Sequence, residues 1–299
     1  MSDTASPSQP GPSSDKRSIT QDASAPAETR STGSRGLFVA LVILLLTALV
    51  VVTCDVWLTS RLVAQQREHS KEHAFWILCQ PGYSPDVRRN AFLLLVANGN
   101  KEWRSALLSD LDLAKVSLAG VQLEAAAFRR TKFAGASLAA AKLNKSSFEL
   151  ADLTVADLEK ADLSDAQLYR TILKGTKLNR AILRGANLQE IKAQGAQFLA
   201  ADLGDSDCLM ADFTGANLAG VNFTGARLEA AKFSGANLSL ARLQDTNIRD
   251  ADFAGCNWWR ARGLTSSRIE FLKKNFFPST NAPAALRADF EKWLNDQKP

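Results

Sequence analysis

The chain has 299 residues with a formal net charge of +5, and 22% of its residues are charged. This length allows one or two domains with cores of their own, and so mild a basic excess does not predict a nucleic-acid partner. The four cysteines form no CxxC pair and are too few for a disulfide framework, so they indicate neither a metal site nor an oxidising compartment.

An apolar segment follows a polar N-terminal tail. Residues 1–35 are rich in Ser, Pro, Thr, Ala and Gly, which predicts a disordered tail. Residues 36–54 contain no charge and would span about 29 Å as a helix, close to the thickness of a bilayer core. We therefore predict a single-pass transmembrane helix over 36–58. A core helix is disfavoured by the density of Leu and Val, and a cleaved signal peptide by the long polar leader.

The orientation of that helix is left open, because basic residues flank both of its ends. Residues 59–82 are predicted to continue the helix beyond the membrane as far as Pro81. His69, Glu72 and His73 match the H-x-x-E-H pattern of inverted zinc proteases. Such an enzyme needs a further carboxylate from a large surrounding fold, whereas a solvated charged helix explains the same residues. We expect no metal, no cofactor and no catalytic residue.

Residues 83–112 are predicted to form a helical cap. Ser84, Pro85 and Asp86 are typical of a helix N-terminus, and the apolar block that follows is expected to pack on the next domain. Trp103 and Leu107 are expected to complete this plug.

Residues 113–258 carry the strongest pattern of the chain, a large apolar residue at every fifth position. We call that position i; it is Leu or Phe in 26 of 30 cases, and position i−2 is Ala in 18. A period of five fits neither a helix nor a long strand, so each pentad forms one side of a solenoid. Residues i−2 and i then face the interior, i−1 faces solvent, and i+1 and i+2 form a corner. Cys208 and Cys256 fall in this register as interior fillers, and at Ala193 the missing bulk is supplied by Ile191.

The corners have their own chemistry. Ten of the eleven glycines between Leu111 and Trp258 lie at i+2, where a type II turn requires positive φ. Runs such as Ala211–Gly215 and Ala216–Gly220 resemble the A(D/N)LXX pentads of the pentapeptide-repeat family. The resemblance covers about half of the chain. It implies a right-handed quadrilateral β-helix, mainly β, with four pentads per coil and about seven coils.

Residues 259–299 are predicted to form a second helical cap. Ser267 with Glu270 resembles a capping box for a helix that ends at Asn275. A last helix after Pro278 would place four apolar residues on the final coil: Leu286, Phe290, Trp293 and Leu294.

Two faces of the rod carry predictions. Residues twenty apart stack on successive coils and form one wall of the rod. On the wall that contains Leu113, the i−1 residues alternate in sign, from Asp112 and Lys132 to Asp252, which predicts a ladder of opposite charges. The wall of Phe128 differs, because its corners combine the residue types that interfaces prefer. We name this set the contact corner and treat it as a candidate interaction surface: Arg129, Arg130, Leu150, Tyr169, Arg170, Leu209 and Met210.

Three function classes follow. We favour a membrane-anchored structural or protein-interaction module with an unknown protein partner, and pairing of two rods stays open. The family resemblance also suggests a DNA mimic that binds type II topoisomerases, but the repeat region carries 17 acidic and 17 basic residues, and mimicry needs a strongly acidic face. An enzyme is disfavoured, because the rod contains no histidine and no phosphate loop.

Overall fold

The computed structural model describes residues 33–80, 82–97 and 103–297. Residues 1–32 of the tail predicted to be disordered lie outside them, whereas residues 33–35 are helical, which corrects the predicted end of the tail. The chain divides into two compact units, one ending at Val63 and the other beginning at Ala64. Each unit is considered by itself below.

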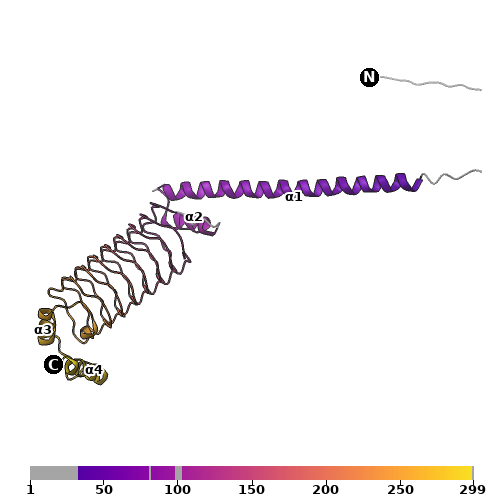
Figure 1. Cartoon of the computed structure of the whole chain (residues 1–299). Coiled ribbons are helices and arrows are strands. Elements are labelled where there is room, and N and C mark those ends of the chain that lie inside the picture. Colours follow the sequence, from indigo (N-terminus) through magenta and orange to yellow (C-terminus); the bar gives the residue numbers. More distant parts are fainter. Residues whose placement is uncertain (1–32, 81, 98–102, 298–299) are drawn as a thin grey trace, which may run out of the picture. The chain divides into compact units, whose positions relative to one another are not determined.

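A single long helix, α1, runs from Gly33 to Cys79 (Figure 1). It covers both the predicted transmembrane segment and its predicted extension. The stretch Leu41–Leu78 contains an 18-residue window that is apolar enough to cross a membrane, with a mean hydropathy of 2.6, and this window is 0% buried within the protein. The apolar segment is therefore not a core helix of this chain, although a signal sequence would have the same length and composition.

From Trp103 onward the chain forms stacked coils of 20 residues each (Figure 1). Parallel bridges join each i−1 residue to its equivalent one coil later, as in Asp112 with Lys132 and Lys132 with Asp152. Four turns lie between the two residues that each bridge joins, which confirms four pentads per coil. Within the described residues the contacts are isolated bridges, because each extended side is too short for a longer strand. The pattern begins at Trp103, ten residues before the predicted boundary, so residues 103–262 make about eight coils rather than seven.

Each corner is a β-turn with one residue of positive φ. The i+3 amide donates to the carbonyl of residue i, as from Ala136 to Phe133 at 2.9 Å. Positive φ occurs at i+2 both where that residue is glycine, such as Gly215 at 66°, and where it is not, such as Met210 at 57°. A single positive φ at the third turn residue agrees with the predicted type II turn. Gly204, the exception to the glycine pattern, lies beneath Arg184, where a Cβ would come within 2.9 Å of the guanidinium.

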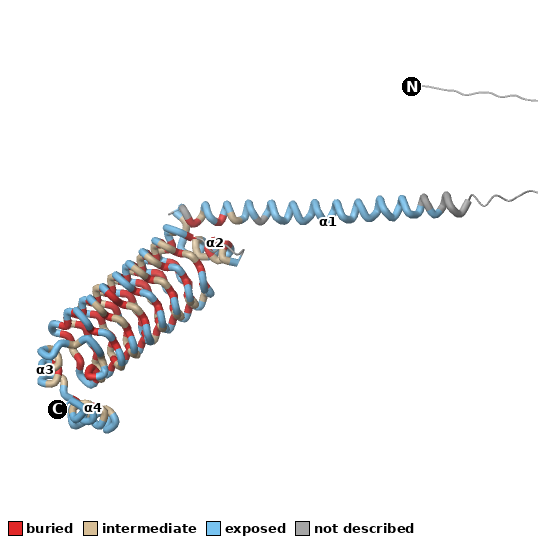
Figure 2. Tube along the Cα trace, viewed as in Figure 1, coloured by how far each residue is buried: buried red, intermediate tan, exposed pale blue. Residues whose placement is uncertain are grey.

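The interior contains the predicted residues. Every i residue from Leu113 to Trp258 is buried, and buried and exposed positions alternate along each coil (Figure 2). Phenylalanines stack on successive coils, as Phe213 on Phe233 with ring centroids 5.4 Å apart. The buried fillers Cys208 and Cys256 are in their predicted places, and the exchange of Ala193 with Ile191 leaves both side chains enclosed. The register read from the sequence is thus confirmed.

The N-terminal cap is helix α2, Pro85–Ala97, which begins where predicted, with Ser84 Oγ accepting from the Val87 amide at 3.4 Å. Its Phe92 packs on Trp103 with ring centroids 4.9 Å apart. The predicted role of Leu107 is wrong. It occupies an i−1 position and is 63% exposed, whereas the neighbouring i residue Leu108 is fully buried. An extended chain turns successive side chains to opposite sides, so only one of the two can enter the core.

The C-terminal cap consists of η1 (Trp258–Arg260), α3 (Ser266–Asn275) and α4 (Ala284–Asp296). The predicted capping box is wrong: Thr265 is the N-cap of α3, and its hydroxyl accepts from the Arg268 amide at 3.4 Å. Thr265 has the extended backbone that an N-cap needs, while Ser267 is already helical. Phe290 of α4 is buried against the last coil, as predicted.

Candidate interaction surface

The Asp and Asn residues at i−1 have a structural role in the turns. Their Oδ1 atoms accept from the backbone amide two residues later, as at Asp152 from Thr154 (2.9 Å) and at Asn237 from Ser239 (3.1 Å). This bond satisfies an amide that the turn leaves without a backbone partner. It explains why the repeat prefers Asp or Asn directly before the large apolar residue.

Aspartates of the predicted charge ladder make hydrogen bonds of this kind instead of ion pairs. On the wall of Leu113, Asp212 accepts from Thr214 at 3.0 Å and from Gln194 at 2.5 Å. Among the described residues no ion pair within 4 Å joins the alternating charges of this wall. Burial raises the pKa of Asp212, but the hydrogen bonds from Thr214 and Gln194 and the charge of Lys232 outweigh it, so the net pKa is lowered. The main role of the aspartates of this wall is therefore to accept hydrogen bonds within the turns, and the balance of charge with neighbouring lysines is secondary.

The seven residues of the contact corner lie at i+1 or i+2 of a single wall and come from four of five successive coils; the coil of Leu188 contributes none of them. The side chains of Met210 and Leu150 are 56% and 41% exposed, and Tyr169 and Leu209 are half-buried. Exposed Leu150 and Met210 and the half-buried Tyr169 and Leu209 thus lie along one edge of the rod. That this edge is an interaction surface stays a prediction.

The arginines of this corner are paired with acidic residues one coil away. Arg170 Nε donates to Glu190 at 2.8 Å, and its guanidinium also stacks over the ring of Tyr169, 4.9 Å from the centroid. Tyr169 donates to the same carboxylate at 3.1 Å. The hydrogen bond from Arg170 lowers the pKa of Glu190, and the one from Tyr169 adds to it, against a smaller opposing effect of burial. This three-residue cluster holds Arg170 in one orientation.

Arg130 is held in the same way, since its Nε donates to Asp110 at 2.6 Å. Arg129 is placed more loosely, 3.7 Å from Glu149. Sequence reasoning missed these acidic partners, although a spacing of about 20 residues between opposite charges is visible in the sequence. The corner consequently has no stripe of one sign, and Leu150 and Met210 are its protruding apolar side chains.

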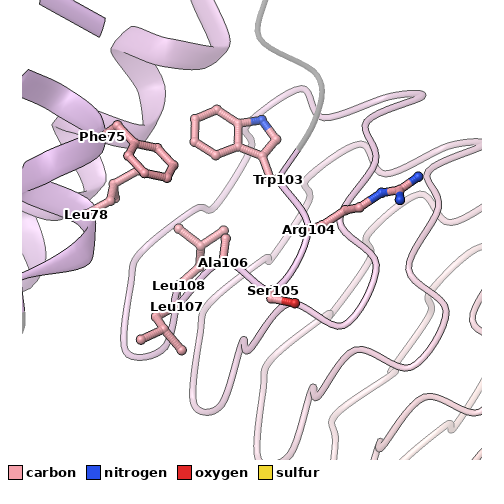
Figure 3. A pocket seen from close by; sticks show the side chains of 8 residues that line it. All are labelled: Phe75, Leu78, Trp103, Arg104, Ser105, Ala106, Leu107 and Leu108. Carbon is pink, nitrogen blue, oxygen red and sulfur yellow. The ribbon is translucent and has the colours of Figure 1, made fainter. Parts of the chain in front are cut away.

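A cavity of about 460 Å³ lies at the other end of the rod, between the end of α1 and the first coil (Figure 3). Phe75 and Leu78 face Trp103 and Leu108 across it, and the guanidinium of Arg104 points away from the apolar side chains. The cavity is apolar and contains no acid, base or nucleophile in a catalytic arrangement.

The H-x-x-E-H segment lies on the exposed part of α1. His69 Nδ1 and Glu72 Oε2 are 3.7 Å apart, and both side chains are more than three-quarters exposed. His73 instead stacks on Trp76, with ring centroids 6.0 Å apart. Among the described residues no group of three His, Cys, Asp or Glu side chains is placed to hold a metal ion.

The repeat region matches the family model of pentapeptide repeats in 8 copies, over segments from 131 to 220 and from 222 to 260. Among curated protein sequences, none matches the chain.

Solved structures to which this chain is similar include HetL and a second pentapeptide-repeat protein, together with QnrB1. HetL, from the cyanobacterium Nostoc sp. strain PCC 7120, is 23% identical over 56% of this chain and 95% of its own, with a TM-score of 0.28. QnrB1, a plasmid-mediated fluoroquinolone resistance protein, is 16% identical over 58% and 89%, with a TM-score of 0.44. A protein of the Arabidopsis thaliana thylakoid lumen is 25% identical over 46% and 89%, with a TM-score of 0.19.

Proposed function

Because the repeat region matches the family model of pentapeptide repeats, we propose that the chain is a membrane-anchored structural and protein-interaction module of that family. In this proposal α1 crosses the bilayer once and the β-helix presents the contact corner to a protein partner. Pentapeptide-repeat proteins are in general non-catalytic, and we assign no catalytic step to this chain.

The observation that carries the anchor is the exposure of apolar side chains along α1. Leu44 and Leu45 are 69% and 61% exposed, and exposed leucine continues through this part of the helix. A row of apolar side chains with no protein cover is stabilised by lipid, not by water. Trp57 with Arg61 stacked 4.9 Å above its ring ends the apolar run, as interfacial residues do.

The anchor is tested by extraction of membranes from cells that express the full chain. We expect the wild type to resist alkaline carbonate. The double substitution Leu45→Arg and Val50→Arg places two charges in the apolar window, each at a cost of about 3 kcal/mol for insertion, and should release the protein. Gln65→Arg, outside the apolar run, is the control and should stay with the membrane. Release of the wild type by carbonate would refute the anchor.

The contact corner is supported by the pre-ordered cluster of Tyr169, Arg170 and Glu190 next to exposed Leu150. Tyrosine and arginine dominate binding energy at interfaces when they are held in place before binding. Proximity labelling from the C-terminus should identify neighbours of the wild type in intact cells. Leu150→Asp should remove a partner that binds this corner, whereas Val155→Asp, at the equivalent turn position of the next wall, should not. Equal neighbour lists for both variants would refute the corner.

A further inference from the structure

One side of the C-terminal half of the rod carries no charge. We call it the uncharged face and define it by residues 194–200, 214–220, 234–240 and 254–258. At the chain average of 22%, a set of 26 residues would hold about six charged side chains, and this set holds none. The same side of the two preceding coils is charged, with Asp157 on one and Lys174, Lys177 and Arg180 on the other. The change of character is therefore confined to four successive coils.

The outward side chains of this face are amides. Gln197, Asn217, Asn237 and Asn257 stack one per coil, and Asn257 Nδ2 donates to Asn237 at 2.9 Å while Asn237 Nδ2 donates to Asn217 at 3.2 Å. Each NH₂ group has two hydrogens; the bond to Asn217 uses one of those of Asn237, whereas Asn257 also donates to Ser239 Oγ at 2.9 Å. An amide side chain carries a donor and an acceptor, so the ladder is chemically complementary to a second ladder of the same kind.

Two corners border this face; one of them is flat and the other is apolar. Gly215 and Gly235 form one corner, and a Cβ added to either would meet no atom within 4 Å. The opposite corner exposes Leu199 and Leu240, 44% and 56% accessible. A flat polar surface with protruding leucines can approach another flat surface closely and cover the leucines.

We propose that the uncharged face pairs two copies of this chain side by side, an inference that rests on the proposed membrane anchor. A second copy fits better than a different partner, because a surface without charge cannot select a partner by charge complementarity, whereas a two-fold contact needs only self-complementarity. Four coils about 4.8 Å apart and a side roughly 14 Å wide give on the order of 300 Å² per copy, well below the ~800 Å² of a stable complex. Pairing thus depends on confinement of both copies in one membrane, which raises their effective concentration.

The test uses the full chain in vesicles, with donor- and acceptor-labelled copies mixed at a low ratio of protein to lipid. Flotation of the vesicles first reports insertion, and energy transfer on the floated protein then reports pairing. Asn237→Lys places like charges opposite each other across the two-fold contact and should weaken pairing about tenfold or more. Asn187→Lys is the matched control: Asn187 also caps a turn, accepting from Gln189 at 3.1 Å, but on the opposite side of the rod. It should transfer energy as the wild type does.

Each outcome decides the proposal. Floated wild type without energy transfer, or Asn237→Lys with undiminished transfer, would overturn the pairing while leaving the anchor intact. Equal losses in Asn237→Lys and Asn187→Lys would also overturn it, because a lost turn contact would then explain both. Protein that does not float would refute the anchor itself and, with it, the confinement on which the pairing depends.

Discussion

Replacing Gly263 by alanine is expected to open the last coil of the rod. Gly263 has φ of 79°, and a Cβ there would lie 2.8 Å from the amide nitrogen of Gln244 and 3.0 Å from its Cα. Backbone atoms cannot rotate away as a flexible side chain can. The segment before it is held by hydrogen bonds from Arg262 to Ala241 (2.7 Å) and from Leu243 to Arg262 (2.8 Å). The clash should weaken both.

The magnitude follows from two contributions. A left-handed backbone costs a non-glycine residue about 1–2 kcal/mol, and forced overpacking costs about 1–3 kcal/mol. Gly263→Ala should therefore lower the free energy of unfolding by roughly 2–5 kcal/mol. Gly215→Ala is the matched control, since φ is 66° and no atom lies within 4 Å of the added Cβ. It should lose only the backbone contribution, about 1–2 kcal/mol.

Two measurements check this expectation. Urea unfolding followed by circular dichroism gives the stability of each variant, and hydrogen exchange at the amides of Leu243 and Arg262 reports opening of the last coil. Only Gly263→Ala should accelerate exchange at these two amides. Equal stability losses with unchanged exchange would show that the contact with Gln244 relaxes at no cost, and the reasoning would fail.

Three further predictions test the register, the interior and the C-terminal cap. Leu108→Ala should destabilise the rod by about 2–5 kcal/mol in urea unfolding, because Leu108 is fully buried, whereas the exposed Leu107→Ala should change little. Burial raises the pKa of the Cys208 and Cys256 thiols to about 12, so neither should react with iodoacetamide at pH 8 until the protein is unfolded. Since folding raises both pKa values above about 9, their contribution to stability is complete below pH 9 and should fall as the pH rises from 9 to 12. A hydrogen bond from Arg260 lowers the pKa of Asp289. The contribution of Asp289 to stability is therefore present above about pH 3.8 and is lost as the pH falls below that value. Asp289→Asn should abolish this acid dependence in thermal unfolding.

Local repetition explains why so much of the fold could be predicted. The pentad places each residue with respect to its own turn, so burial at i and i−2 and the positive φ at i+2 require no knowledge of distant contacts. The structure extends the rule to residues such as Met210, which takes φ of 57° because the coil geometry demands it and not because of its own preference. At Trp103 the i residue is neither Leu nor Phe, but Ala106 and Leu108 already follow the repeat, so the earlier start could have been recognised at least one pentad before Leu113.

The errors at Leu107 and Ser267 have a common origin. Each concerned a segment where the repeat gives way to a cap, and there the choice between neighbouring residues depends on which backbone conformation the chain adopts. An apolar side chain or a capping hydroxyl can be recognised in the sequence, but the direction in which it points is set by the coil or helix that it joins.

The register, the interior and the apolar helix could be predicted from the order of the residues, because they depend on periodicity and composition. The partners of the outward charges are known only from the stacked coils. Arg170 is held by Glu190, while Asp212 caps a turn instead of pairing along its wall. The reason is physical: a long side chain on a coil has several partners within reach, on its own turn and on the coils on either side. Hydrogen-bond geometry selects among them only when the coils are stacked.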